Sequence, residues 1–199
     1  GGSVAFNVSE NNWLGRGINL TTFIDINAET FLGGLTVTDP NYNFSGNSLS
    51  VFATNTSNDK PDVGFKNNII KTGIGTSFEQ YRGIFLSPTI SYSYDDLKVL
   101  DTASDSLKKQ KGAFQDLSFD YGITLDKRDK IYAPTAGYIS TFQQAVPIYA
   151  DAPYIKNTYS FSKYMALSEN AIGTFKFYGS AINGLNDEVE SVSKYMNND

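Results

Sequence analysis

Apolar and polar residues alternate with a period of two almost from end to end of this chain. In LSFDYGITL the side chains of Leu117, Phe119, Tyr121, Ile123 and Leu125 share one face, and polar or small residues share the other. Since successive side chains of a β-strand point to opposite faces, this pattern predicts one-sided strands. Ten such strands are predicted, near residues 3–10, 17–27, 30–38, 47–56, 64–78, 83–95, 114–126, 137–146, 157–168 and 171–183.

The predicted strands have the length and polarity expected of a membrane-crossing barrel. Many are about 10 residues long, above the roughly 5 to 6 of globular sheets and close to the roughly 9 to 11 that a tilted strand needs to cross a bilayer. Their polar faces carry mostly Ser, Thr, Asn, Gly and Gln. A soluble sandwich usually places Lys and Glu on such faces, so small polar groups favour the lining of a closed barrel.

The connections form a second pattern along the chain. The odd connections are compact, whereas most even ones are longer, with KVLDTASDSLKKQKGA the longest. Antiparallel neighbours place the two sets at opposite ends, as in a barrel with short periplasmic turns and longer outer loops. The compact end carries the aromatic residues expected of an interfacial girdle, namely Trp13, Tyr42, Phe44, Tyr81, Tyr132 and Tyr138. The alternative for each of them is an ordinary core residue that flanks a turn.

Composition excludes several classes of function. The 199 residues contain no cysteine and no histidine, which removes disulfides, thiolate or imidazole metal sites and triads that use Cys or His. The net charge of −5 argues against nucleic acid as a partner. No apolar run reaches the roughly 20 residues of a membrane helix, and GGSVAFNVSENN lacks the regions of a signal peptide. We expect no cofactor, no metal and no enzymatic activity.

The groups that could carry chemistry are weak candidates. Three carboxylate clusters would serve a glycosidase or a calcium site, but none has calcium-loop spacing, and we expect solvated strand ends or loops: Asp95 with Asp96, Asp126 with Asp129, and Asp187 with Glu188. The basic run at 107–112 is interpreted as a solvated loop tip, with contact to lipopolysaccharide or a partner as the alternative. Gly15 and Gly17 predict a tight turn with positive φ, since no helix follows to bind phosphate.

LDKRDKIYAPTAGY combines charge and turn-forming residues directly after a predicted strand. Extending the faces of that strand puts Asp126 and Arg128 inward, where they could pair, and puts Lys127 outward, where its ammonium can reach lipid headgroups. Pro134 stops ladder pairing and Gly137 can adopt a turn conformation, so the next strand begins near Tyr138.

Several motifs, in this order, resemble the barrel domain of the BamA family of outer-membrane β-barrel assembly proteins. They are NNWLGRG (Asn12, Trp13, Leu14, Gly15, Gly17), TDP (Thr38, Asp39, Pro40), LDKRD followed by PTAGY (Asp126, Arg128, Asp129, Pro134, Thr135, Gly137, Tyr138), and INGLND at 182–187. DPNYNF is longer than the usual Asp-Pro-Tyr-Phe turn of that family. The resemblance implies an all-β, antiparallel, up-and-down transmembrane β-barrel, of which this chain carries about ten strands.

The resemblance also implies an organisation and a function. The family has a sixteen-stranded barrel after periplasmic POTRA domains, and residues 1–199 are similar to strands two to eleven as far as about 188, with an unmatched tail at 189–199. POTRA domains, the two seam strands and the sixth-loop Arg-Gly-Phe motif are outside this chain, so we expect a fragment or a truncated reading frame.

The implied function is the folding and insertion of β-barrel proteins in the bacterial outer membrane. The implied partners are outer-membrane lipids, unfolded β-barrel clients and assembly-complex lipoproteins. The alternatives are a TamA-like or two-partner secretion transporter, a passive porin, and a soluble secreted β-sandwich that binds carbohydrate.

Overall fold

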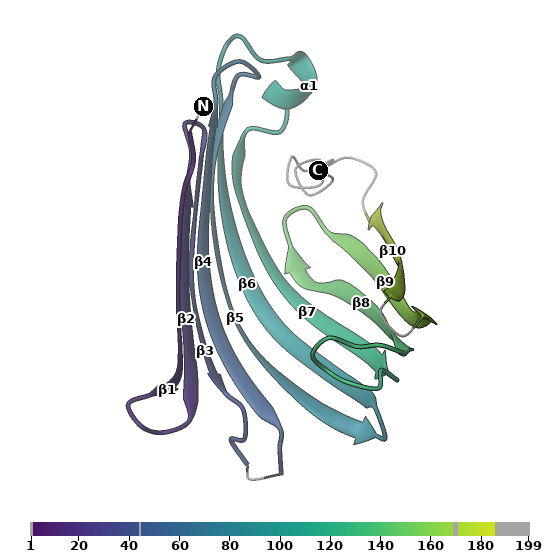
Figure 1. Cartoon of the computed structure of the whole chain (residues 1–199). Coiled ribbons are helices and arrows are strands. Elements are labelled where there is room, and N and C mark those ends of the chain that lie inside the picture. The colour runs from purple at the N-terminus through teal and green to yellow at the C-terminus, as the bar shows by residue number, and fades with distance from the viewer. Residues whose placement is uncertain (1, 44, 169–170, 186–199) are drawn as a thin grey trace.

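Ten antiparallel strands form one sheet in the order in which they occur along the chain (Figure 1). The computed structural model describes residues 2–43, 45–168 and 171–185. The strands are β1 (Val4–Trp13), β2 (Ile18–Ile26), β3 (Thr30–Asp39), β4 (Ser48–Lys60), β5 (Phe65–Tyr81), β6 (Ile84–Val99), β7 (Gly112–Asp126), β8 (Gly137–Ala150), β9 (Tyr154–Ser168) and β10 (Ala171–Gly184). The predicted up-and-down topology is confirmed, and a β-sandwich is wrong because the described strands form a single sheet.

Most strands are longer than the alternation alone predicted, reaching 17 residues in β5, whereas β2 is shorter. β4 continues to Lys60 instead of ending near 56, and in this extension of the ladder Asp59 lies opposite Lys66 and forms an ion pair of 2.8 Å with it. Cross-strand pairs of opposite charge support such pairing. The polar sequence SNDK at 57–60, which lies between two predicted strands, therefore belongs to β4.

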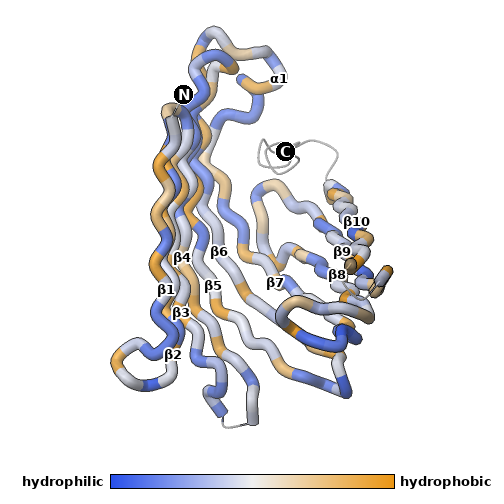
Figure 2. Tube along the Cα trace, in the orientation of Figure 1, coloured by the Kyte–Doolittle hydropathy of each residue, from blue (hydrophilic) through white to orange (hydrophobic). Residues whose placement is uncertain are grey.

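Hydrophobic and hydrophilic residues alternate along the strands (Figure 2). Since successive side chains of a strand point to opposite faces, the two faces of the sheet differ in polarity. One row of directly opposed residues joins Val37, Val51, Ile74, Ile90 and Phe119 across β3 to β7. Val51, Ile74 and Ile90 each keep nearly half of their surface exposed. We call the face that carries this row the outer face. So much contiguous exposed apolar surface is unusual for a soluble monomer and suits contact with lipid.

The other side of the sheet, which we call the inner face, is lined by small polar groups that bond across strands. Examples are the hydroxyls of Thr38 and Ser50 at 2.8 Å, and of Ser91 and Ser118 at 2.9 Å. A third hydroxyl pair joins β7 to β8. The predicted lining of the strands with small polar residues is thereby confirmed.

The connections lie at two ends of the sheet, as predicted (Figure 1). The odd turns form the short-turn end, where Trp13, Tyr42, Tyr81 and Tyr132 keep between 38% and 88% of their surface exposed. Phe44, also expected there, lies outside the described residues. The even connections form the long-loop end, which carries α1 (Asp105–Lys108), a helix that alternation did not predict. No helix in the described ranges is long and apolar enough to cross a membrane.

A small apolar core lies under the longest loop, between β6 and β7. Leu97 and Phe65 are buried there, and Val99, Leu107 and Phe114 pack against them. The loop is also tied to the β4–β5 turn, since the N–H of Leu100 donates to the carbonyl of Gly64 at 2.8 Å. The loop is thus packed onto the sheet at the long-loop end.

Candidate functional site

The β7–β8 turn is built around an ion pair between Asp126 and Arg128. The guanidinium donates from Nε and Nη2 to the two carboxylate oxygens, at 2.9 and 2.6 Å. Both side chains are largely shielded from solvent, with 20% and 17% of their surface exposed. Asp126 lies opposite Ile139 and shares the inner face of β7 with Asp120. The predicted pairing of Asp126 with Arg128 is therefore confirmed, and its fork geometry is one that Lys cannot reproduce.

Asp129 closes the same turn from the opposite side. Its carboxylate accepts hydrogen bonds from the hydroxyl and N–H of Thr135 and from the N–H of Ala136. These bonds, led by the Thr135 hydroxyl and then by the Ala136 N–H, lower the pKa of Asp129 from 3.8 to about 2. A carboxylate with several donors keeps its charge because each donor stabilises the ionised form. Asp129 is thus a structural acceptor in the turn.

Gly137 allows the chain to leave this turn and start β8. Its φ is +93°, and a Cβ at this position would collide with the carbonyl of Lys127. Ala133, just before Pro134, also has positive φ, at 47°. Such conformations favour glycine, so Gly137 is required by the backbone and its predicted turn role is confirmed.

The same turn directs Lys127 and Tyr138 to the outer face. The N–H of Lys127 donates to the carbonyl of Tyr138 at 2.8 Å, which extends the β7–β8 ladder by one pair. The ammonium of Lys127 donates to the carbonyl of Arg82 in the β5–β6 turn, also at 2.8 Å. Its headgroup contact remains a prediction.

The NNWLGRG segment forms a tight turn with positive φ at Leu14, Gly15 and Gly17, as predicted for the glycines. Asn12 holds it, since its side-chain oxygen accepts from the N–H of Gly17 at 2.7 Å. Asn12 and Trp13 themselves belong to β1, so the connection is shorter than the sequence indicated.

At the β3–β4 connection, Asp39 is the last residue of β3 and Pro40 follows it. The carboxylate of Asp39 accepts from the N–H of Asn41 at 3.0 Å, and the side chain of Asn41 accepts from the N–H of Gly46 at 2.6 Å. Hydrogen bonds accepted by the side chains of Asp39 and Asn41 therefore stabilise this longer turn.

The inner face lines an open cavity of about 820 Å³ with charged groups in its wall. Asp95, Asp116 and Asp120 line it together with Lys71 and Lys156. One oxygen each of Asp116 and Asp120 is buried without a hydrogen-bond partner among the residues that the structure describes. The register brings these carboxylates together from two strands, and no feature of a single strand reveals that.

The prediction that the carboxylate clusters lie only at strand ends or in loops is wrong for Asp95. Asp95 lies within β6, and its carboxylate accepts from buried Asn67, whose own amide oxygen accepts from buried Asn58. Alternation marked this residue as polar-facing, but the ladder continues past it to Val99. Asp187 and Glu188 lie outside the described residues. In the described ranges, no group of three carboxylates is placed to hold a metal ion.

The sheet has two open edges. In the described part of the chain, β1 pairs only with β2, and β10 pairs only with β9. β1 is exposed along its whole length. An unpaired edge presents N–H and C=O groups that can bind another strand. The polar cavity and the turn motifs are the features from which a function can be proposed.

An exposed apolar outer face, a polar inner face and an up-and-down ladder define the wall of a transmembrane β-barrel. The sequence matches the Omp85 superfamily domain over residues 12–197. The chain belongs to this superfamily.

A solved structure with a similar fold is BamA from Haemophilus ducreyi lacking POTRA domains 1–3. The TM-score is 0.74 at 18% identity, over 92% of this chain and 38% of that one. The chain therefore spans well under half of that protein, and at this identity the likeness establishes the fold. The predicted resemblance to a BamA-like barrel is confirmed. No curated protein matches the chain.

Proposed function

We propose that this chain is part of the barrel wall of an insertase that folds β-barrel proteins into the bacterial outer membrane. The observation that carries the proposal is that one face of the sheet is apolar and exposed, whereas the other face is polar and lines a cavity, in a chain of the Omp85 superfamily. A wall of this kind is stable where one side meets lipid and the other meets water. Its partners would be outer-membrane lipids, unfolded β-barrel clients and assembly-complex lipoproteins.

The antiparallel sheet supports a mechanism without covalent chemistry. Backbone groups at a sheet edge bind an extended segment by adding it as a strand. In lipid, unpaired N–H and C=O groups are costly, so an open edge favours strand addition. Further strands from the remainder of the barrel would cover β1 and β10, and clients would be templated at the seam where the barrel closes. POTRA domains would precede the barrel and receive clients.

The test is client folding by the full-length protein, with its natural flanking sequence, in liposomes. A urea-unfolded outer-membrane protein is added, and its folded fraction is followed by its heat-dependent migration on a gel. We expect faster folding than in empty liposomes. Folding at the rate of empty liposomes would contradict the proposal.

A transporter of the two-partner secretion type is the second candidate, because the polar cavity of about 820 Å³ would also suit passage of an extended chain. Upstream sequence separates the two functions, since five POTRA repeats favour an insertase and two or three favour a transporter. Export of a partner substrate, without acceleration of client folding, would identify a transporter.

A further inference from the structure

Two lysines and two aromatic residues lie in one row of the outer face at the short-turn end. The N–H of Lys127 bonds to Tyr138, Tyr138 lies opposite Lys163, and Lys163 lies opposite Phe175. Directly opposed residues of an antiparallel pair share a face, so these four side chains project to the same side. The row runs from the β7–β8 turn across β8 and β9 to β10.

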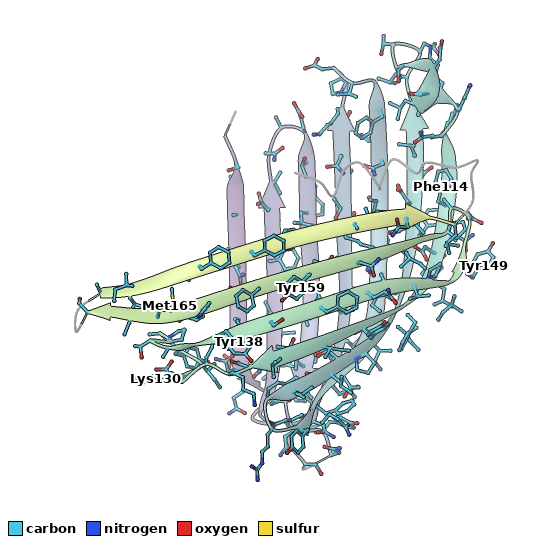
Figure 3. All side chains as sticks on the ribbon, turned by 90° about the vertical axis from the view of Figure 1, so that its right-hand side faces the viewer. Phe114, Lys130, Tyr138, Tyr149, Tyr159 and Met165 are labelled. Carbon is cyan, nitrogen blue, oxygen red and sulfur yellow. The ribbon has the colours of Figure 1, made fainter. Side chains whose placement is uncertain are left out.

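Three aromatic side chains and one methionine surround Lys163 on the outer face. Tyr138 and Phe175 flank it on the neighbouring strands, and Phe161 and Met165 flank it along β9. The ring centroids of Tyr138 and Phe161 are 5.9 Å apart, and those of Phe161 and Phe175 are 6.5 Å apart. Figure 3 shows Tyr138 and Met165 near one another at the same end of β8 and β9. Lys163 itself is exposed.

In the part of the chain that the structure describes, the charges of this row have no carboxylate partner. Among the described residues, neither Lys127 nor Lys163 forms an ion pair with a carboxylate. Three described carboxylates at this end bind other groups: Glu79 accepts from the N–H of Gly83, Asp126 binds Arg128, and Asp129 binds Thr135 and Ala136. The row is therefore a cationic stripe in a protein of net charge −5.

The long-loop end is different. There the lysines of the outer face have partners, since Lys66 binds Asp59 at 2.8 Å and Lys98 binds Asp96 at 3.5 Å. The absence of such partners around Lys163 is thus local. Tyrosine and lysine side by side at the edge of an apolar face are suited to the boundary between acyl chains and headgroups.

We propose that Lys163, supported by Tyr138 and Lys127, binds the phosphate of an anionic phospholipid in the leaflet at the short-turn end. Neighbouring strands are about 4.8 Å apart. The backbones of Lys127 and Lys163, two strand spacings apart, are therefore roughly 10 Å apart, so that both lysines can reach the same lipid headgroup or two adjacent ones. The ammonium of Lys127 uses one donor on Arg82 and keeps two for a phosphate. The acyl chains would lie along Phe161 and Phe175. This inference rests on the lipid-facing side of the wall and not on client folding.

The test is lipid retention by the full-length protein, purified from nanodiscs that contain equal amounts of phosphatidylglycerol and phosphatidylcholine. Native mass spectrometry gives the ratio of bound phosphatidylglycerol to bound phosphatidylcholine. A lysine near an anionic lipid surface contributes about 1 kcal/mol, so we expect Lys163→Gln to lower this ratio about fivefold. Lys127→Gln should lower it about twofold, since that ammonium is partly engaged with Arg82.

The control variants are Lys163→Arg, which keeps the charge, and Lys66→Gln, which removes an outer-face lysine that is paired at the other end. Both should keep the wild-type ratio, and heat-dependent gel migration verifies that each variant is folded. An unchanged ratio in folded Lys163→Gln would overturn the proposal. Loss of the preference on addition of millimolar inorganic phosphate would also overturn it, because the site would then bind free phosphate. Client folding is not measured, so failure here leaves the insertase proposal intact.

Discussion

The β7–β8 turn and the β6–β7 loop connect to the two ends of one strand, β7, and they are held by different forces. The turn contains no buried apolar side chain and is fixed by the carboxylates of Asp126 and Asp129 and by the backbone of Gly137. The loop is fixed by the apolar core around Leu97 and Phe65. Directional bonds fix the geometry of a short connection, whereas a long one becomes ordered by burying apolar surface. The predictions below test this difference in the full-length protein.

The largest effect is expected for Gly137→Ala in the turn. Positive φ and the collision of the new Cβ with the Lys127 carbonyl should lower the free energy of unfolding by at least about 3 kcal/mol. Urea unfolding in micelles, followed by the fluorescence of Trp13, measures the change. The control is Gly122→Ala in β7, where the nearest side-chain atom is 3.6 Å from the new Cβ, with a change within about 0.5 kcal/mol. Equal effects of the two variants on the free energy of unfolding would refute the conclusion that the backbone at position 137 requires glycine.

At the end of β6, under the loop, Leu97→Ala should lower the free energy of unfolding by about 3 kcal/mol, because Leu97 is only 2% exposed and its truncation leaves a cavity. The loop should also become sensitive to trypsin at Lys108. Leu100→Ala, in the loop itself and 48% exposed, should change the free energy of unfolding by less than about 1 kcal/mol. Unchanged trypsin cleavage in Leu97→Ala would show that the apolar core does not hold the loop.

Asp126→Asn removes the charge that binds Arg128 and should cost about 1.5 kcal/mol, since hydrogen bonds to charged groups are stronger than neutral ones. Asp59→Asn is its control at the long-loop end. The Asp59–Lys66 pair is also short, at 2.8 Å, but both side chains are more than half exposed, so its loss should cost less than about 0.5 kcal/mol. Urea titrations of the two variants compare the pairs directly. A larger loss for Asp59→Asn would reverse the assigned ranking.

The smallest effect is a dependence on pH from Asp129. Its pKa is about 2 in the folded protein, below the ordinary 3.8, so its contribution is present above pH about 4 and is lost as pH falls through about 2. The urea midpoint should therefore drop between pH 5 and pH 2.5 in an uncharged detergent. Asp129→Asn should make this drop smaller, and an identical drop in both proteins would contradict the role of Asp129.

The sequence predicted the strands and the turn chemistry well, because both depend on residues close together in the chain. The alternation of β7 fixed its faces, and Asp126, Arg128 and Gly137 took the turn roles that their spacing indicated. The ends of β4 and β6 were placed too early, since polar residues at strand ends look like loop until their cross-strand partners are known. The helix α1 was missed because a four-residue helix has no periodicity to detect.

Tertiary structure alone decided which distant residues meet. The chain Asn58–Asn67–Asp95, the three carboxylates of the cavity, and the row of Lys127, Tyr138 and Lys163 all join different strands. Alternation assigns each side chain to a face, but a ladder can shift along its strands without changing the pattern of either strand by itself. Register is set by turn length and by packing across the whole sheet. The sequence by itself therefore determined a one-sided, up-and-down sheet, and the paired strands decided where its charges gather.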